Sequence, residues 1–155
     1  MVLLGGGEFT YEVSGEDWGN LPEGWTYKEA TAVAVDSNDN IWVVDSMNHR
    51  IQKFTKEGKF LAKWGKLGDG DGEFNMPWGI TIDKQDNIYV ADWRNDRIQK
   101  FTPDGQFLMK VGSSGSGEGE LNRPTGVAVD KDGIIYVADW MNDRLQVFDA
   151  NGSWI

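Results

Sequence analysis

The sequence predicts an all-β protein, a β-propeller of four-stranded antiparallel blades, with three blades in the chain. Three observations predict this fold class. One stretch of sequence occurs three times at a spacing of 47 residues, beginning at Asp36, Asp83 and Asp130. Each copy consists of short runs rich in β-branched and aromatic residues that are separated by turn residues. No segment shows the periodicity of about 3.6 residues that marks an amphipathic helix.

The second copy shows the expected elements in order. Four short runs alternate between apolar and polar residues or are rich in β-branched residues, and we expect each to be a strand: 79–82, 88–91, 98–101 and 107–110. Turn residues, mainly Asp, Asn and Gly, separate them at 83–87, 93–96 and 103–105. Four antiparallel strands that recur every ~40–50 residues are typical of a propeller blade, because each copy has an apolar face that only a neighbouring copy can bury.

The repeated residues resemble the NHL repeat. The pattern that carries the resemblance is G-[IV]-x-[IV]-D-x-x-[DG]-x-[IV]-Y-V-A-D-x-x-N-x-R-[IL]-Q-x-F-x-x-x-G, and it extends from Ala32 to Ile155. The resemblance implies a closed ring of about six blades. It also implies that an Asp at the end of the second strand pairs with an Arg at the start of the third: Asp45 with Arg50, Asp92 with Arg97, and Asp139 with Arg144. The first copy departs most from the pattern, at Ala32, Ser46 and His49.

The spacing places blade 1 at 32–65, blade 2 at 79–112 and blade 3 at 126–155, all within one half-propeller domain, 1–155. Blade 3 lacks its outermost strand, whereas the segment 9–18 has the composition of such a strand. Three blades do not close a ring, but two chains joined head to tail do. We therefore expect a six-bladed homodimer in which 9–18 completes the last blade of the partner. The alternatives are a fragment of a longer protein and an engineered half.

The segment 5–43 is also similar to bacterial NHL proteins related to peptidyl-α-hydroxyglycine α-amidating lyase. That resemblance implies a metal in the pore, with zinc bound by His residues of the innermost strands. Here Trp78 and Thr125 occupy the matching positions, and the single His, His49, lies in an outer loop, where we expect a solvated turn residue. A catalytic zinc site needs three protein ligands. We therefore expect no lyase activity, no catalytic residues and no metal site.

The composition bears on partners and location. The chain carries 25 Asp and Glu against 15 Lys and Arg, a net charge of −10, so we expect it to repel the phosphates of nucleic acids. Four basic residues could form a local patch, but the interleaved acids favour a mixed, solvated face: Lys66, Arg94, Arg97 and Arg123. No apolar run reaches the ~18 residues of a membrane span, no signal peptide is visible, and Cys is absent. These features favour a cytoplasmic protein with no membrane partner.

Three acidic stretches invite comparison with calcium loops. They lie at 36–40, 83–87 and 68–73, but none matches the twelve-residue loop that ends in a bidentate Glu. We expect local turns at the first two and a flexible connector at the third. We therefore expect no cofactor, and a divalent cation held on the pore axis by backbone carbonyls is the alternative.

Tryptophan gives the clearest indication of a binding site, because the chain contains 8 of them. Packing between blades accounts for Trp18, Trp42 and Trp64. The remaining candidates fall in loops that share one face of a propeller, around an apolar, acid-rimmed pore entrance, where exposed aromatic residues mark recognition sites. We expect a small molecule or a protein to bind there through Trp78, Trp93, Arg94, Arg123, Thr125 and Trp140, with Asn95 and Asn142 adding polar contacts.

The sequence thus predicts a non-catalytic binding or scaffold module, a homodimer whose top face recognises an unidentified ligand or protein. One alternative is a metal-dependent, lyase-like enzyme that uses the central pore. Another is a half-propeller fragment with no independent function. The shortage of His, Cys and pore carboxylates argues against the enzyme.

Overall fold

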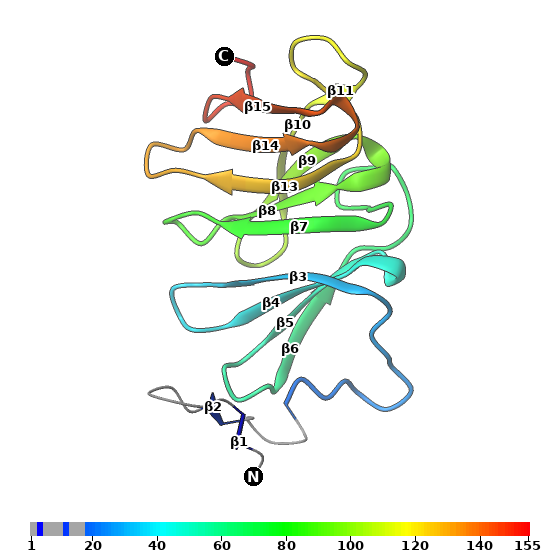
Figure 1. The fold of residues 1–155 in the computed structure, drawn as a ribbon. Coiled ribbons are helices and arrows are strands. Elements are labelled where there is room, and N and C mark those ends of the chain that lie inside the picture. Colours follow the sequence, from blue (N-terminus) through cyan, green and yellow to red (C-terminus); the bar gives the residue numbers. More distant parts are fainter. Residues whose placement is uncertain (1–2, 5–10, 13–17) are drawn as a thin grey trace.

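The computed structural model describes residues 3–4, 11–12 and 18–155. In this part of the chain, three antiparallel sheets follow one another in sequence and lie side by side, as Figure 1 shows. The first two sheets have four strands and the third has three. The all-β class and the four-stranded antiparallel sheets predicted from the sequence are confirmed.

Each sheet runs in chain order from its innermost to its outermost strand. The first sheet contains β3 (Ala30–Val35), β4 (Ile41–Asp45), β5 (Arg50–Phe54) and β6 (Phe60–Trp64). The second contains β7 (Pro77–Ile82), β8 (Ile88–Asp92), β9 (Arg97–Phe101) and β10 (Phe107–Val111). The third contains β13 (Pro124–Val129), β14 (Ile135–Asp139) and β15 (Arg144–Phe148). A short 3₁₀ turn joins the second strand of each sheet to the third: η1 (Ser46–Asn48), η2 (Trp93–Asn95) and η3 (Trp140–Asn142).

The innermost strands begin two residues earlier than the sequence predicted, because each carries a β-bulge near its start. Pro77 pairs with Asp92, and the register shifts before Ile80 pairs with Val90. The third sheet has the same irregularity just after Pro124. Proline is tolerated at the first position of a strand, and a bulge changes the direction in which nearby side chains point. The bulge therefore influences where the residues after each Pro lie.

Two short strand pairs complete the described structure. β1 (Leu3–Leu4) pairs antiparallel with β2 (Tyr11–Glu12), and β11 (Ser113–Ser114) pairs parallel with β12 (Glu120–Leu121). The segment 9–18, expected to complete a partner's blade, lies mostly outside the described residues. Its last residue, Trp18, is in a turn. The strand exchange and the six-bladed homodimer are not shown by a single chain and stay predictions.

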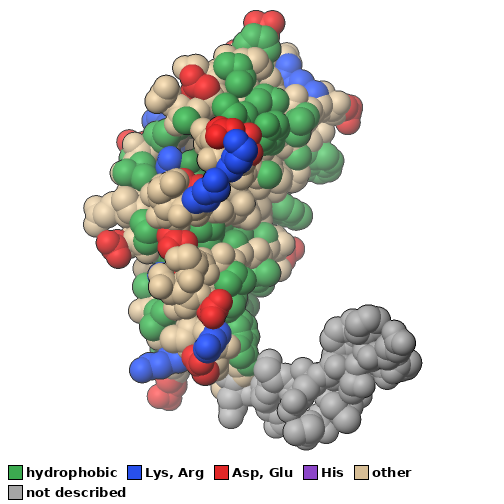
Figure 2. Space-filling model, turned by 90° about the vertical axis from the view of Figure 1, so that its left-hand side faces the viewer, with side chains coloured by type: hydrophobic (Ala, Val, Ile, Leu, Met, Phe, Trp, Pro, Cys, Tyr) green, Lys and Arg blue, Asp and Glu red, His purple; other side chains and the backbone are tan. Residues whose placement is uncertain are grey.

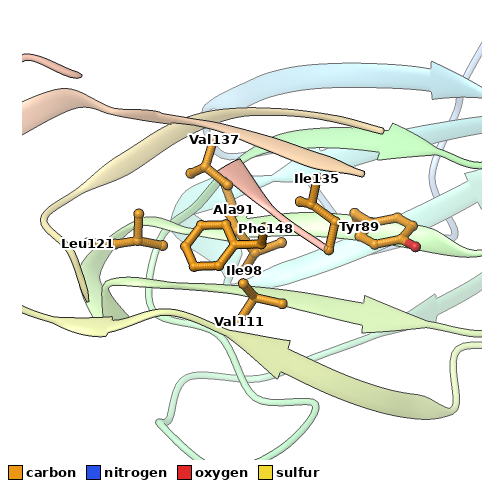
Figure 3. Packing of buried hydrophobic residues seen from close by; sticks show 8 residues of the cluster. All are labelled: Tyr89, Ala91, Ile98, Val111, Leu121, Ile135, Val137 and Phe148. Atoms are coloured by element: carbon orange, nitrogen blue, oxygen red, sulfur yellow. The ribbon is translucent and has the colours of Figure 1, made fainter. Parts of the chain in front are cut away.

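Apolar side chains fill the two interfaces between neighbouring sheets, and the two sets correspond position by position at the 47-residue spacing. The first interface buries Trp42, Val44, Ile51, Phe74, Ile88, Val90 and Phe101. The second, drawn in Figure 3, buries Tyr89, Ala91, Ile98, Val111, Leu121, Ile135, Val137 and Phe148. Trp64 packs against the first set, whereas Trp18, also expected in the interior, is 37% exposed.

A fully buried Asp ends the second strand of every sheet: Asp45, Asp92 and Asp139. In the second sheet, Asp92 accepts hydrogen bonds from the Asn75 amide at 2.7 Å, Asn95 Nδ2 at 2.8 Å and Arg97 Nε at 2.9 Å. Burial raises the pKa of Asp92 against the lowering effect of these bonds, so the carboxylate depends on its partners to stay ionised. The Asp–Arg pairing implied by the resemblance is confirmed in all three copies, at 2.7–2.9 Å.

The Arg of each pair ties the preceding linker to the sheet. The remaining N–H groups of Arg97 donate to the backbone carbonyls of Asp69, Gly70 and Glu73 at 2.7–3.0 Å. The linker therefore folds back over the loop between the second and third strands. The stretch 68–73, expected to be a flexible connector, is instead held by a buried guanidinium.

The acidic stretches at 36–40 and 83–87 form local turns, as predicted. Asp36 Oδ1 accepts the backbone N–H groups of Asn38 at 3.0 Å and Asn40 at 2.9 Å, which is the bonding of an Asx turn. Although burial raises the pKa of Asp36, hydrogen bonds from Asn40, Trp42 and Lys53 outweigh this and lower it to about 2. The ionised Asp36 carboxylate therefore stabilises the turn through these hydrogen bonds.

Replacing Arg97 by Ala should lower the free energy of unfolding by about 3–5 kcal/mol, because it leaves the buried Asp92 carboxylate without its charged partner. Urea denaturation measures the change. Lys110→Ala is the matched control, since the ion pair of Lys110 with Asp71 is about half exposed and should contribute less than ~1 kcal/mol. Equal losses in the two variants would contradict a structural role for the buried pair.

Candidate ligand-binding site

The candidate site lies where the starts of the innermost strands meet the 3₁₀ turns, on the right in Figure 1. Trp93 and Trp140 are the first residues of η2 and η3, each directly after a buried Asp. Trp78 and Thr125 are the second residues of β7 and β13 and lie within the bulges. Because the hydrogen bonds of the Asp fix the turn, they also fix the tryptophan that begins it.

Three tryptophan rings form a continuous row. The ring centroids of Trp78 and Trp93 are 5.8 Å apart, and those of Trp93 and Trp140 are 6.3 Å apart, with the latter rings stacked at 30°. Together with Thr125 they line an apolar cavity of about 290 Å³. Trp78 is 37% exposed and Trp140 is 54% exposed, so the cavity opens to solvent.

Two arginines complete the surroundings of the central ring. The guanidinium carbon of Arg123 lies 5.0 Å from the centroid of Trp93, and that of Arg94 lies 5.4 Å from it. Both distances are within the range of cation–π attraction. The ring at the centre of the row therefore carries two positive charges beside it, and the acid-rimmed entrance expected from the sequence stays a prediction. The six candidate residues all gather around Trp93.

The two asparagines named with them do not belong to the site. Asn95 Nδ2 donates to Asp92 and to the Gly68 carbonyl, both at 2.8 Å. Asn142 donates in the same way to Asp139 and to the Gly115 carbonyl, both at 2.9 Å. Both side-chain amides form hydrogen bonds within the loops. The two asparagines therefore act on the site only by fixing the turns that carry Trp93 and Trp140.

The four basic residues considered as a patch separate into different roles. Arg97 is buried in its pair with Asp92, and Lys66 lies 3.0 Å from Glu73. Arg94 and Arg123 each lie over the ring of Trp93. On the opposite face, drawn in Figure 2, acidic and basic side chains are interspersed.

His49 is not the solvated turn residue expected from the sequence. Its Nδ1 accepts the backbone N–H of Met76 at 3.0 Å, which links the first sheet to the strand start of the second. It also lines a second cavity of about 390 Å³ with Met47, Leu67, Asn75, Met76 and Arg94. Burial lowers the pKa of His49. The same contact occurs one repeat later, where Asp96 at the equivalent position accepts the Arg123 N–H at 2.8 Å.

Within residues 3–4, 11–12 and 18–155, no group of three or more His, Cys, Asp or Glu is arranged to hold a metal ion. The chemistry of the candidate site follows from its residues. It offers flat apolar surfaces and two guanidinium groups, and its lining contains no acid or base that titrates near neutral pH. Such an arrangement can bind an apolar group next to an anion.

Comparison with known proteins agrees with this architecture. A family model for the NHL repeat matches residues 28–54, 74–101 and 121–148, more than half of the chain. The protein brain tumor of Drosophila melanogaster is 41% identical over 51 residues, which are 33% of this chain and 5% of the fly protein.

Solved structures with the same fold include lyases. A streptogramin B lyase has a TM-score of 0.63 and 21% identity, over 79% of this chain and 38% of that one. A catalytically inactive histidine-to-alanine variant of virginiamycin B lyase from Staphylococcus aureus, solved with quinupristin, has a TM-score of 0.65 and 18% identity, over 95% of this chain and 43% of that one. The chain thus spans less than half the length of these structures, and the β-propeller fold predicted from the sequence is confirmed. Among the described helices, none has the length and apolar character needed to cross a membrane.

Replacing His49 by Asp should remove one source of pH dependence from the stability. The pKa of His49 is lower in the folded chain than the ~6.5 of an unfolded His, so its contribution is full above about pH 6.5 and is lost as the pH falls below it. Between about pH 7.5 and pH 5.5, the unsubstituted chain should lose about 1 kcal/mol more than the variant, the value of one hydrogen bond. Urea midpoints at the two pH values measure this, and identical losses would contradict the assignment.

Proposed function

Because this chain belongs to the NHL-repeat family, we propose that it is a non-catalytic binding module that recognises its ligand in the cavity between Trp78, Trp93 and Trp140. One observation carries the proposal: three indoles line an apolar cavity of about 290 Å³ that is open to solvent, and two guanidinium groups lie over the central indole. Partly exposed aromatic residues around a concavity are typical of recognition sites.

The residues favour a ligand that combines a flat apolar group with an anionic one. Indole rings offer large, rigid surfaces that stack with planar or aliphatic groups. Arg94 and Arg123 lie against the central ring, and guanidinium N–H groups pair well with carboxylates and phosphates. Either a small molecule or a segment of a protein with an aromatic and an acidic side chain would fit.

A metal-dependent, lyase-like enzyme is the second candidate, and the fold shared with lyases favours it. Two observations support binding without turnover instead. The one His of the chain already accepts the Met76 amide, whereas the virginiamycin B lyase of Staphylococcus aureus is inactive in a histidine-to-alanine variant. In addition, no candidate metal cluster occurs in the described part of the chain.

The partners follow from the same features. We propose that the module is a homodimer, since two copies of three sheets would supply the six blades of a closed ring. Exchange of the segment 9–18 between copies is part of this proposal. The net charge of −10 disfavours nucleic acid as a ligand.

Naphthalene-1-acetate and its neutral analogue naphthalene-1-acetamide test the site, with binding followed by quenching of tryptophan fluorescence. Trp140→Ala should weaken the binding of both probes about tenfold, because it removes one wall of aromatic contact. Arg123→Gln should weaken the acetate at least ~5-fold and leave the acetamide unchanged, because it removes a positive charge from the rim.

Trp154→Ala is the matched control, because Trp154 is 42% exposed and lies outside the cavity. Equal effects of the Trp140 and Trp154 substitutions would contradict the site. Quinupristin incubated with the chain and Mg²⁺ separates binding from catalysis. Liquid chromatography should recover it as one unchanged peak, and a new peak that needs the chain would establish the enzyme instead.

A further inference from the structure

We propose that two copies of this chain bind head to tail through the outer faces of their first and third sheets, and that this contact repeats the sheet-to-sheet interface that forms twice within each chain. The proposal rests on the homodimer proposed above and identifies its surfaces. It does not depend on the ligand cavity. The face of the third sheet is called the trailing face, and that of the first sheet the leading face.

The trailing face is the unpartnered equivalent of two buried surfaces. The first sheet places Trp42, Val44 and Ile51 against the second sheet, and the second sheet places Tyr89, Ala91 and Ile98 against the third; none of these six is more than 1% exposed. At the 47-residue spacing, the same positions in the third sheet are Tyr136, Ala138 and Leu145. Leu145 is 61% exposed and Ala138 is exposed. The third sheet therefore presents the surface that its two predecessors bury.

The leading face is the other half of the same interface. The first sheet packs against four apolar residues of the second sheet: Ile80, Ile82, Ile88 and Val90. The second sheet packs in the same way against four residues of the third: Val127, Val129, Ile135 and Val137. The equivalent positions of the first sheet are Val33, Val35, Ile41 and Val43. Val33 is 66% exposed and Val35 is 56% exposed. Both halves of an interface that is already formed twice are thus present on one chain, with Val33, Val35 and Leu145 exposed and Val43 already buried at 4% exposure.

Trp18 shows that the leading face is shaped to receive a preceding sheet. Trp64, on the outermost strand of the first sheet, packs against Phe101 at 6.2 Å, and its Cδ2 lies 3.1 Å from where a Cβ on Gly105 would stand. Trp18 packs against Phe54 at 6.1 Å, and its Cδ1 lies 3.0 Å from where a Cβ on Gly58 would stand. Trp18 therefore packs against the first sheet in the way that Trp64, from the outermost strand of the first sheet, packs against the second sheet.

A hydrogen bond that recurs at each internal interface is unmade at the two ends. Nδ1 of His49 accepts the Met76 N–H at 3.0 Å, and Oδ1 of Asp96 accepts the Arg123 N–H at 2.8 Å. The next acceptor is Asp143, and the donor that precedes Met76 by one repeat is the amide of Glu29. Their backbones match, with φ of 51° at Asp143 and 57° at Glu29 against 52° at Asp96 and 56° at Arg123. A head-to-tail contact would pair them.

Two further polar positions complement each other across the same contact. At the first interface, Ser37 N donates to Asp86 Oδ1 at 2.9 Å, and Thr31 Oγ1 donates to the Trp78 carbonyl at 2.8 Å. In the contact between two copies, Lys131 of the third sheet would face Asp39 of the second copy. The Thr125 hydroxyl would face the Thr31 carbonyl of the second copy. Lys131 now lies 2.7 Å from Asp132, with both side chains well exposed. The opposite charges of Lys131 and Asp39 favour a second copy as the occupant.

A heterologous contact either closes a ring or continues into a fibre. Because each copy supplies three sheets, we commit to closure after two. The contact would also place Trp140 beside Thr31 of the second copy, as Trp93 lies beside Thr125 within one chain.

Light scattering over a range of concentrations tests the contact. The unsubstituted chain should have twice the mass of 17.4 kDa. Leu145→Asp should raise the dimer dissociation constant at least ~100-fold, because it places a carboxylate in a buried apolar interface. Leu108→Asp is the matched control, since Leu108 is 47% exposed on the middle sheet, away from both end faces, and it should leave the mass unchanged.

The outcomes separate the two proposals. A folded chain with the mass of one copy would overturn the homodimer itself, and a dimer that survives Leu145→Asp would keep the homodimer but overturn these surfaces. A mass that grows beyond two copies would overturn closure. Near-UV circular dichroism confirms that the variants fold. A charge swap gives an independent reading: Lys131→Glu and Asp39→Lys should each weaken the dimer, and the double variant should recover it.

Discussion

The buried carboxylate at the end of each second strand is the constraint on which the rest of the structure depends. A buried charge is costly unless it is paired and hydrogen-bonded. Asp92 meets this requirement only if the turn after it presents Asn95, the third strand presents Arg97, and the linker before the sheet presents the Asn75 amide. One side chain thus fixes a turn, a strand start and a linker. Trp93 lies between these fixed parts, so the position of the candidate site follows from the same constraint.

The repeated contacts explain why apolar side chains are buried in the middle of the chain and exposed on the first and third sheets. In a repeat protein, each unit contacts only its neighbours, and every internal interface reuses the same positions. The second sheet buries both of its faces, whereas the first and third each leave one uncovered. Val33 and Leu145 are exposed for this reason. Their exposure is a consequence of the repeat rather than an irregularity of either sheet.

The sequence predicted what is local or repeated, and missed what depends on contacts between repeats. Strand positions, Asx turns such as that of Asp36, and the Asp–Arg pairs follow from spacing and residue type within one copy. The grouping of Trp78 with Trp93 followed from topology. The role of His49 did not, because its partner lies 27 residues away and meets it only once two sheets pack. Arg94 and Arg123 were both named from the sequence as site residues, but that their guanidinium groups both lie over the Trp93 ring is visible only in the folded structure.

The contrast between overall and local charge bears on the class of ligand. A net charge of −10 describes the field at a distance, but salt screens exposed charges beyond ~8 Å at physiological ionic strength. At the cavity, the charges within reach are the guanidinium groups of Arg94 and Arg123, at 5.4 and 5.0 Å from the Trp93 centroid. Long anionic polymers would meet the distant field along their whole length. A compact ligand with one anionic group would meet mainly the two guanidinium groups, which is why the proposed ligand is a compact anion rather than a polymer.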